Sequence, residues 1–111
     1  MAFTDSFTLP EPLRSEVDAL PAVVLEFGTG WCGFCRGVQP LIAGAFAEHA
    51  GGDDIRHIKI EDGSGRPLGR SFRVKLWPTL IVLKNGAEVA RVVRPQRQED
   101  VAQALAQLDA A

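Results

Sequence analysis

The sequence predicts an α/β fold in which helices flank a central mixed β-sheet. Three runs, at 22–27, 55–60 and 79–83, indicate strands, and the apolar, β-branched run at 22–27 is typical of a buried one. The segments after the first two runs carry helix signals, and strands joined through helices are expected to be parallel. Asn85-Gly86 directly after the third run is a strong signal for a two-residue hairpin, which must be antiparallel. We therefore expect parallel strands plus a C-terminal antiparallel hairpin.

Length and composition indicate one ordinary globular domain over residues 1–111. The apolar share of 46% and the charged share of 23% are typical of such domains. The net charge of −2 gives no sign of nucleic-acid or anionic-membrane binding. Residues 1–7 lack the basic and apolar parts of a signal peptide, and no segment reaches transmembrane length. We expect a protein of the reducing cytoplasm, where a pair of nearby cysteines is more often catalytic or metal-binding than structural.

The N-terminal region predicts a short edge strand within residues 1–8 and then a helix over 10–20. Two prolines mark the start of this helix, and Leu13, Val17 and Leu20 recur at helical spacing. A further proline directly after it ends the helix, because proline cannot continue one.

The segment that follows strand 22–27 predicts a long helix over 33–50. Its apolar face is formed by Val38, Leu41, Ile42, Ala45 and Phe46. Pro40 lies inside it and lacks an N–H, so we expect a kink near Arg36. A turn is expected at 51–54.

The C-terminal half predicts strands at 55–60, 79–83 and 88–93. A short helix is expected at 66–72 and a last amphipathic helix at 98–108. The side chains expected to face the core from the last helix are Val101, Leu105 and Leu108.

Both cysteines of the chain lie where strand 22–27 gives way to the long helix. Cys32 and Cys35 are three residues apart, so on a helix their Cα atoms lie about 5 Å from each other, within the reach of a disulfide. Cys32 is expected at the helix N-terminus, where unpaired N–H groups favour an anion. Its thiol should therefore lose its proton readily and become a nucleophile.

Other interpretations of the cysteine pair are less favoured. A structural staple that closes so short a loop contributes only about 2 kcal/mol. A zinc site needs four ligands, and the remaining candidates, His49 and His57, are not at the usual ligand spacing. A pair of inert thiols is the remaining alternative; a catalytic dithiol is favoured and no metal is expected.

The stretch Gly28-Thr29-Gly30-Trp31-Cys32-Gly33 also matches the glycine pattern of a dinucleotide-binding turn. The bulky Trp31 stands where a pyrophosphate would approach the backbone. A chain of 111 residues is also too short for a two-half nucleotide fold. We therefore expect no nucleotide cofactor.

A set of motifs occurs in one order and at one spacing. These are Glu26 inside the first strand, Trp31-Cys32-Gly33-Phe34-Cys35, Lys59, Trp77-Pro78-Thr79 and Lys84-Asn85-Gly86. With them the chain resembles the thioredoxin family over nearly its whole length, least in about the first 20 residues. The resemblance implies a thioredoxin-like fold and a thiol–disulfide oxidoreductase that reduces protein disulfides.

The position of the cysteines, together with the resemblance, predicts a dithiol–disulfide cycle. Cys32 attacks a substrate disulfide, and Cys35 then attacks the Cys32 sulfur and releases the reduced substrate. The Cys32–Cys35 disulfide left behind makes a separate cofactor unnecessary. The resemblance also implies disulfide-containing protein substrates and an NADPH-dependent flavoprotein reductase as partners. We expect a monomer.

Glu26 is the candidate base for Cys35, because the family carries an acid here, most often an aspartate. A carboxylate inside an apolar strand is costly to bury unless it is paired or protonated. The alternative is a strand-end glutamate that faces solvent. Lys59 resembles the family lysine that pairs with this acid, although by itself it would more often be an exposed lysine.

Trp77, Pro78 and Thr79 are expected to face the cysteines and, with Trp31, to bind substrate. The resemblance implies a cis bond before Pro78 and a substrate segment that pairs with the Trp77 backbone as an added strand. Trp77 departs from the smaller aliphatic residue of the family. Its ring either widens an apolar platform beside Trp31 or packs in the core.

Three more positions bear on the substrate and on the redox direction. Arg94 falls where the family usually has a glycine, and if it lines the groove it should favour substrates with acidic residues nearby. Otherwise it is an ordinary exposed arginine. Gly33 and Phe34 separate the cysteines, and Phe34 offers the Cys32 thiolate neither charge nor a hydrogen-bond donor. We therefore expect a reductant with a potential between about −270 and −180 mV.

An alternative function is a thioredoxin-like binding or chaperone module that uses the groove without turnover. The intact cysteine pair with a candidate base favours the oxidoreductase.

Overall fold

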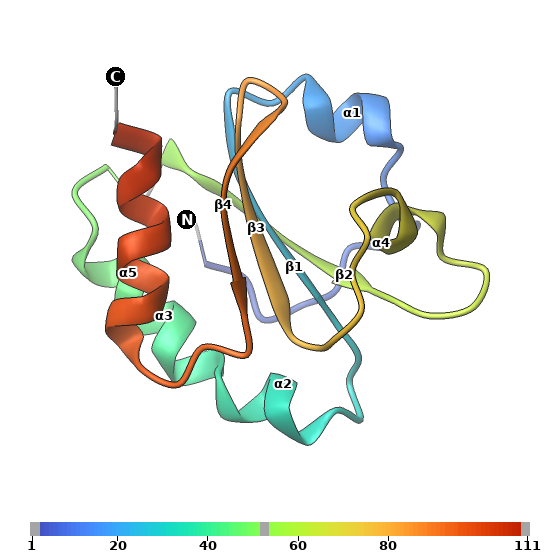
Figure 1. The fold of residues 1–111 in the computed structure, drawn as a ribbon, viewed down its shortest axis with the longest axis horizontal. Helices are drawn as coiled ribbons and strands as arrows, with labels where there is room; N and C mark the ends of the chain where they lie inside the picture. Colours follow the sequence, from blue (N-terminus) through green and yellow to red (C-terminus); the bar gives the residue numbers. More distant parts are fainter. Residues whose placement is uncertain (1–2, 52–53, 110–111) are drawn as a thin grey trace.

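The computed structural model describes residues 3–51 and 54–109. Its sheet contains the strands β1 Ala22–Gly28, β2 Arg56–Glu61, β3 Thr79–Lys84 and β4 Ala87–Val93. They are arranged in the order β2-β1-β3-β4, which Figure 1 shows. The β1–β2 pair is parallel, and the other neighbouring pairs are antiparallel. The predicted α/β fold with a mixed sheet is thus confirmed.

The direction of β3 corrects one detail of the prediction. β3 is antiparallel to β1, although its helical connection from β2 predicts a parallel strand. The helix in that connection, α4 Pro67–Ser71, has five residues and is about 7.5 Å long. The six residues of β2 span about 20 Å, so α4 cannot return the chain to the other end of the sheet.

Helices cover both faces of the sheet, as Figure 1 shows. α3 Gln39–Glu48 and α5 Gln98–Ala106 cover one face, and α1 Arg14–Asp18 and α4 cover the other. Buried residues on the α3–α5 side are Val24, Val38, Ile42, Ala45, Phe46, Ile55, Leu80, Val82, Val101, Ala104, Leu105 and Leu108. Buried residues on the α1–α4 side are Val17, Val23, Leu25, Phe27, Ile58, Ile60, Leu68, Phe72, Ile81 and Leu83. Because side chains alternate along a strand, each apolar run supplies both cores.

The first helix is shorter than predicted. α1 begins only after Leu13, whose N–H donates to Glu16 Oε1 at 2.9 Å and fixes the helix start beyond the prolines. Val17 is fully buried, whereas Leu13 is 66% exposed. A single turn buries only one side of the helix, so the predicted apolar face is reduced mainly to Val17.

The predicted long helix is divided in two, α2 Gly33–Gly37 and α3, with Val38 between them. Pro40 lies in the first turn of α3, where a missing N–H costs nothing. The break therefore replaces the kink that was expected near Arg36. As a separate short helix, α2 lies beyond the end of the sheet (Figure 1).

The closing hairpin is confirmed, since Asn85 and Gly86 have φ values of 50° and 83°. Both fall in the left-handed region that a two-residue type I′ turn requires. The predicted edge strand is limited to one bridge, between Phe7 and Lys59. Residues 1–2, and residues 52–53 of the predicted turn, lie outside the described residues.

The final helix buries the predicted side chains Val101, Leu105 and Leu108, the last of them within a closing 3-10 turn, η2 Gln107–Asp109. No helix in the described part of the chain has both the length and the apolar character needed to cross a membrane.

Candidate active site

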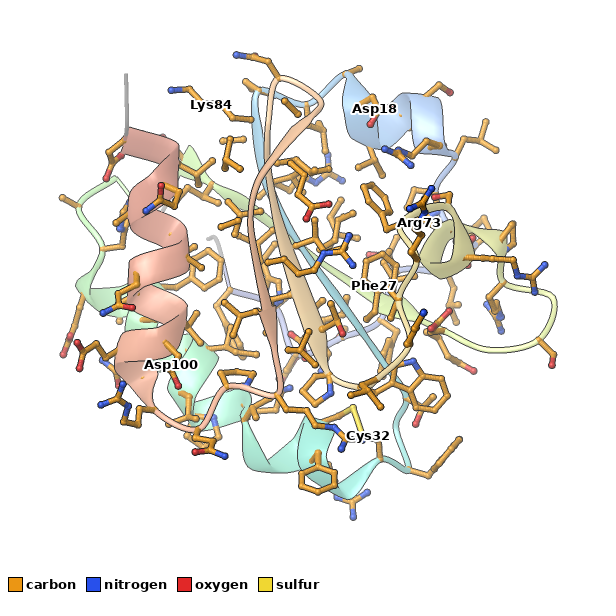
Figure 2. All side chains as sticks on the ribbon, viewed as in Figure 1. Asp18, Phe27, Cys32, Arg73, Lys84 and Asp100 are labelled. Carbon is orange, nitrogen blue, oxygen red and sulfur yellow. A yellow bond between two sulfur atoms is a disulfide. The ribbon has the colours of Figure 1, made fainter. Side chains whose placement is uncertain are left out.

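The cysteines lie where β1 passes into α2. Figure 2 shows Cys32 at the opposite end of the sheet from Asp18 and Lys84. Cys32 and Cys35 are joined by a disulfide, with Cα atoms 5.2 Å apart. Cys32 precedes the first residue of α2, and its Sγ accepts a hydrogen bond from the Cys35 N–H at 3.1 Å. Both side chains are buried. One sulfur thus caps the helix while the other lies one turn along it.

Gly28, the last residue of β1, lies directly against Cys35. A Cβ at this position would be 2.6 Å from Cys35 Sγ, which is closer than real atoms approach. The backbone of β1 therefore packs against the sulfur only because this residue has no side chain. The sequence pattern draws attention to this glycine for a different reason, the apparent dinucleotide motif.

Glu26 is buried in the sheet, with 2% of its surface exposed. This excludes the alternative of a solvent-facing strand-end residue. Its Oε1 lies 2.8 Å from His57 Nε2, and its Oε2 accepts a hydrogen bond from Gln39 Nε2 at 2.7 Å. The buried carboxylate is therefore paired at both oxygens, as its burial requires.

The His57 ring has a defined hydrogen-bonding arrangement. The Thr4 N–H donates to His57 Nδ1 at 2.9 Å, so Nδ1 is an acceptor and the ring proton is on Nε2. His57 Nε2–H then donates to Glu26. The ring also lies between Phe3 and Phe46, with centroids at 5.3 and 5.2 Å. His57 thus supplies a hydrogen-bond donor to the buried carboxyl group of Glu26.

Gln39 joins the acid to the cysteine helix. Its Nε2 donates to Cys35 O at 2.8 Å as well as to Glu26, and its Oε1 accepts from Lys59 Nζ at 3.2 Å. Lys59 Nζ itself is 4.0 Å from Glu26 Oε2. Lys59 is buried, so the alternative of an exposed strand-end lysine is excluded. Its interaction with the acid passes mainly through Gln39.

A cavity of about 260 Å³ opens between this network and the disulfide. Glu26 and Cys35 both line it, together with Thr29 and Lys59. The buried Thr29 Oγ1 has no hydrogen-bond partner among the described residues. Glu26 and Cys35 therefore border one shared cavity.

Sequence reasoning missed His57 and Gln39 as members of the site. A signal for His57 was present, because the alternation of His57-Ile58-Lys59-Ile60 places His57 and Lys59 on one face of β2. The parallel register pairs Lys59 with Glu26 and identifies that face as the one carrying the acid. Gln39 gives no comparable signal, because only the packing of α3 on the sheet brings it to Glu26.

The two tryptophans form an exposed aromatic surface beside the cysteines. Trp31 is 73% exposed, and its ring meets that of Trp77 edge-on with centroids 5.6 Å apart. Trp77 is half-buried, and its Nε1–H donates to Asp62 Oδ2 at 2.8 Å. Of the two alternatives for Trp77, the structure has the ring beside Trp31 rather than in the core.

The Trp77–Pro78 bond is cis, as the resemblance implies. Pro78 and Thr79 are buried, and the Thr79 hydroxyl donates to the Leu76 carbonyl. The Thr79 side chain therefore holds this loop together instead of presenting itself at the surface.

Arg94 lies on the same side of the molecule as the cysteine turn. Its backbone φ is +51°, in the left-handed region that glycine adopts more readily than other residues. Its Nε–H donates to Trp77 O at 2.8 Å, and its guanidinium carbon lies 4.4 Å from the centroid of the Phe34 ring. Phe34 is 61% exposed, and a side chain at Gly33 would point into open space.

Among residues 3–51 and 54–109, no group of three or more His, Cys, Asp or Glu side chains is placed to hold a metal ion.

Comparison with known proteins agrees with this geometry. Residues 8–107 match the family model described as Thioredoxin. The chain is similar to the solved structure of thioredoxin 2 from Pseudomonas aeruginosa PAO1 in its reduced form. The sequence identity is 45% and the TM-score 0.80, over 95% of this chain and 96% of the other.

Two curated relatives are also thioredoxins. Thioredoxin H2-2 of Oryza sativa is 34% identical over 80 residues, which cover 69% of this chain and 55% of the relative. Thioredoxin of Staphylococcus aureus is 30% identical over 82 residues, which cover 74% of this chain and 77% of the relative. The chain thus spans about half the length of the rice relative and about three quarters of the bacterial one.

Proposed function

The chain belongs to the thioredoxin family, and we propose that it reduces protein disulfides as a thiol–disulfide oxidoreductase. The observation that carries this proposal is the position of Cys32 and Cys35. The Cys32 sulfur caps the start of α2 and receives the Cys35 N–H, while Cys35 itself lines the same cavity as Glu26.

In the proposed reaction, the Cys32 thiolate attacks one sulfur of a substrate disulfide. A Cys32–substrate disulfide forms, and the other substrate sulfur leaves as a thiolate that takes up a proton. The N–H of Cys35 stabilises the Cys32 thiolate before the attack, because it donates to that sulfur. Trp31 and Trp77 provide the apolar surface on which the substrate lies.

In the second step, Cys35 loses its proton and attacks the Cys32 sulfur. The Cys32–Cys35 disulfide forms, and the second substrate sulfur leaves as a thiolate, so that two electrons have passed to the substrate. We assign Glu26 as the group that accepts the Cys35 proton across the shared cavity. His57 and Gln39 are positioning residues, because they fix both oxygens of the carboxylate.

A further reductant must return the disulfide to the dithiol. We propose an NADPH-dependent flavoprotein reductase for this role and the cytoplasm as the compartment, where low-potential disulfides are re-reduced. The rings of Trp31 and Phe34 are exposed beside the disulfide, so both the reductase and the substrate can contact an apolar surface there. We propose that the protein acts as a monomer.

Reduction of insulin by dithiothreitol, followed by turbidity, tests the function. The protein should accelerate the reaction, and Cys32→Ser should abolish this effect. Cys35→Ser should accumulate a mixed disulfide with a substrate peptide, visible by mass spectrometry, because the second step is blocked. No acceleration by the wild type would instead favour a binding or chaperone module. Trapping by Cys32→Ser but not by Cys35→Ser would reverse the roles of the two cysteines.

A further inference from the structure

The Arg94 side chain spans the two elements that border the disulfide. Its Nε–H donates to the carbonyl of Trp77, in the loop before β3, at 2.8 Å. Its guanidinium carbon lies 4.4 Å from the centre of the Phe34 ring, which belongs to α2 between the two cysteines. The backbone N–H of Arg94 donates to Pro78 O at 2.9 Å and fixes the root of the side chain. Arg94 therefore covers a backbone acceptor beside the redox pair.

The charge of Arg94 has no carboxylate partner among the described residues. Neighbouring arginines do have one, since Arg91 pairs with Glu88 at 2.8 Å and Arg97 with Asp100 at 3.3 Å. The carbonyl and the aromatic ring that Arg94 contacts carry no net charge. Arg94 is exposed, so an incoming chain can reach this guanidinium.

We propose that Arg94 is a specificity-determining residue that selects disulfide substrates carrying Asp or Glu beside the cysteine that Cys32 attacks. This proposal rests on the function proposed above and adds the substrate class. A substrate carboxylate forms a pair with the guanidinium in which both groups are charged, whereas only the donor is charged in the bond to Trp77 O that this pair replaces. The Arg94 side chain then turns away, and Trp77 O becomes free to accept an N–H of the extended substrate segment.

Two synthetic disulfide-bridged peptides that differ only by Glu or Gln next to the attacked cysteine test this proposal. The wild type should reduce the Glu peptide about fivefold more efficiently in kcat/KM at low ionic strength, which corresponds to about 1 kcal/mol. High salt should decrease this preference, because an exposed pair is screened.

Arg94→Gly should reduce the preference to about one, and its backbone suits glycine, so folding is not at risk. Arg94→Gln is a second neutral variant with the same expected outcome. Arg94→Lys should keep part of the preference, because it retains the charge without the planar fork. Arg73→Gly is the matched control. It also removes an exposed arginine with a positive φ, 58°, but one that lies near α4, and it should leave the preference intact.

The outcomes separate the two proposals. Equal reduction of both peptides by the wild type overturns the role of Arg94 and leaves the oxidoreductase function standing. A preference that survives in Arg94→Gly and Arg94→Gln overturns it as well. Failure of the wild type to reduce either peptide or insulin overturns both proposals.

Discussion

Replacement of His57 by Phe should destabilise the protein strongly, because it removes a donor from a buried carboxylate. A Phe ring retains the aromatic contacts with Phe3 and Phe46 but cannot donate to Glu26. Glu26 loses its 2.8 Å bond from His57 Nε2, and the Thr4 N–H loses its acceptor. A hydrogen bond to a charged group contributes about 1.5–3 kcal/mol, and Glu26 keeps the one from Gln39. We expect the free energy of unfolding to fall by about 2–4 kcal/mol.

Urea denaturation of the oxidised protein at neutral pH, followed by circular dichroism, measures this change. His49→Phe is the matched control. Among the described residues, the one polar contact of the His49 side chain is with the exposed Asp109 at 3.4 Å, so this change should cost below about 1 kcal/mol. The double variant Glu26→Leu/His57→Phe replaces both partners by apolar groups and should cost clearly less than the two single changes together. A His57→Phe cost below about 0.5 kcal/mol, or strict additivity in the double variant, would refute the reasoning.

The remaining predictions concern other parts of the site and the start of α5. Gly28→Ala should destabilise the oxidised protein by about 1–3 kcal/mol in urea, because its methyl group meets Cys35 Sγ at 2.6 Å. Gly37→Ala should not destabilise the protein, because a side chain at Gly37 would have open space around it. Equal destabilisation by the two substitutions would contradict the close packing of Gly28 against Cys35. In stopped-flow measurements, Glu26→Ala should slow release of the mixed disulfide more than its formation, and equal slowing would count against the base role. Backbone N–H donors at the start of α5 hold the pKa of Asp100 below its ordinary value, so its stabilisation is fully present above about pH 4 and is lost as the pH falls through the lowered value. The difference in free energy of unfolding between wild type and Asp100→Asn should therefore shrink on acidification. A difference that stays constant with pH would disprove this contribution of Asp100.

Strands β1 and β3 could be predicted from the sequence because each is a largely apolar run with clear ends. Apart from Glu26 and Thr79, residues 22–27 and 79–83 are apolar on both faces, since both sides of the sheet are covered by helices. Asn85-Gly86 fixed the hairpin, because few other residue pairs adopt two successive positive φ values. These features depend on local chemistry, which a single sequence records.

The errors in the fold depend on lengths and on chain direction. Pro40 indicated a disturbed helix, but a proline can either kink a helix or begin a new one, and the sequence does not distinguish the two. The direction of β3 depended on whether α4 was long enough to return the chain, and helix ends are poorly defined by pattern alone.

Part of the site could likewise be predicted from the sequence, because some of its residues are recognisable from local chemistry alone. Glu26, Cys32 and Cys35 stand out because their chemistry is unusual where they occur. Gln39 has an ordinary residue type at an ordinary helical position, and its three hydrogen bonds join groups from β1, α2 and β2. Such a residue becomes visible only when the elements are placed together in space.

The departures from the family pattern act on different steps of the proposed reaction. Glu26 is held by His57 and Gln39 on the inner side of the disulfide, where it shares a cavity with Cys35. Only the second step uses Cys35 as a nucleophile, so changes to this network should alter release of the substrate. Arg94 lies on the outer side and contacts Trp77 O and the Phe34 ring, which a substrate meets before any bond is exchanged. Changes there should alter encounter with the substrate, and thus kcat/KM, while the rate of release from an already formed mixed disulfide remains the same.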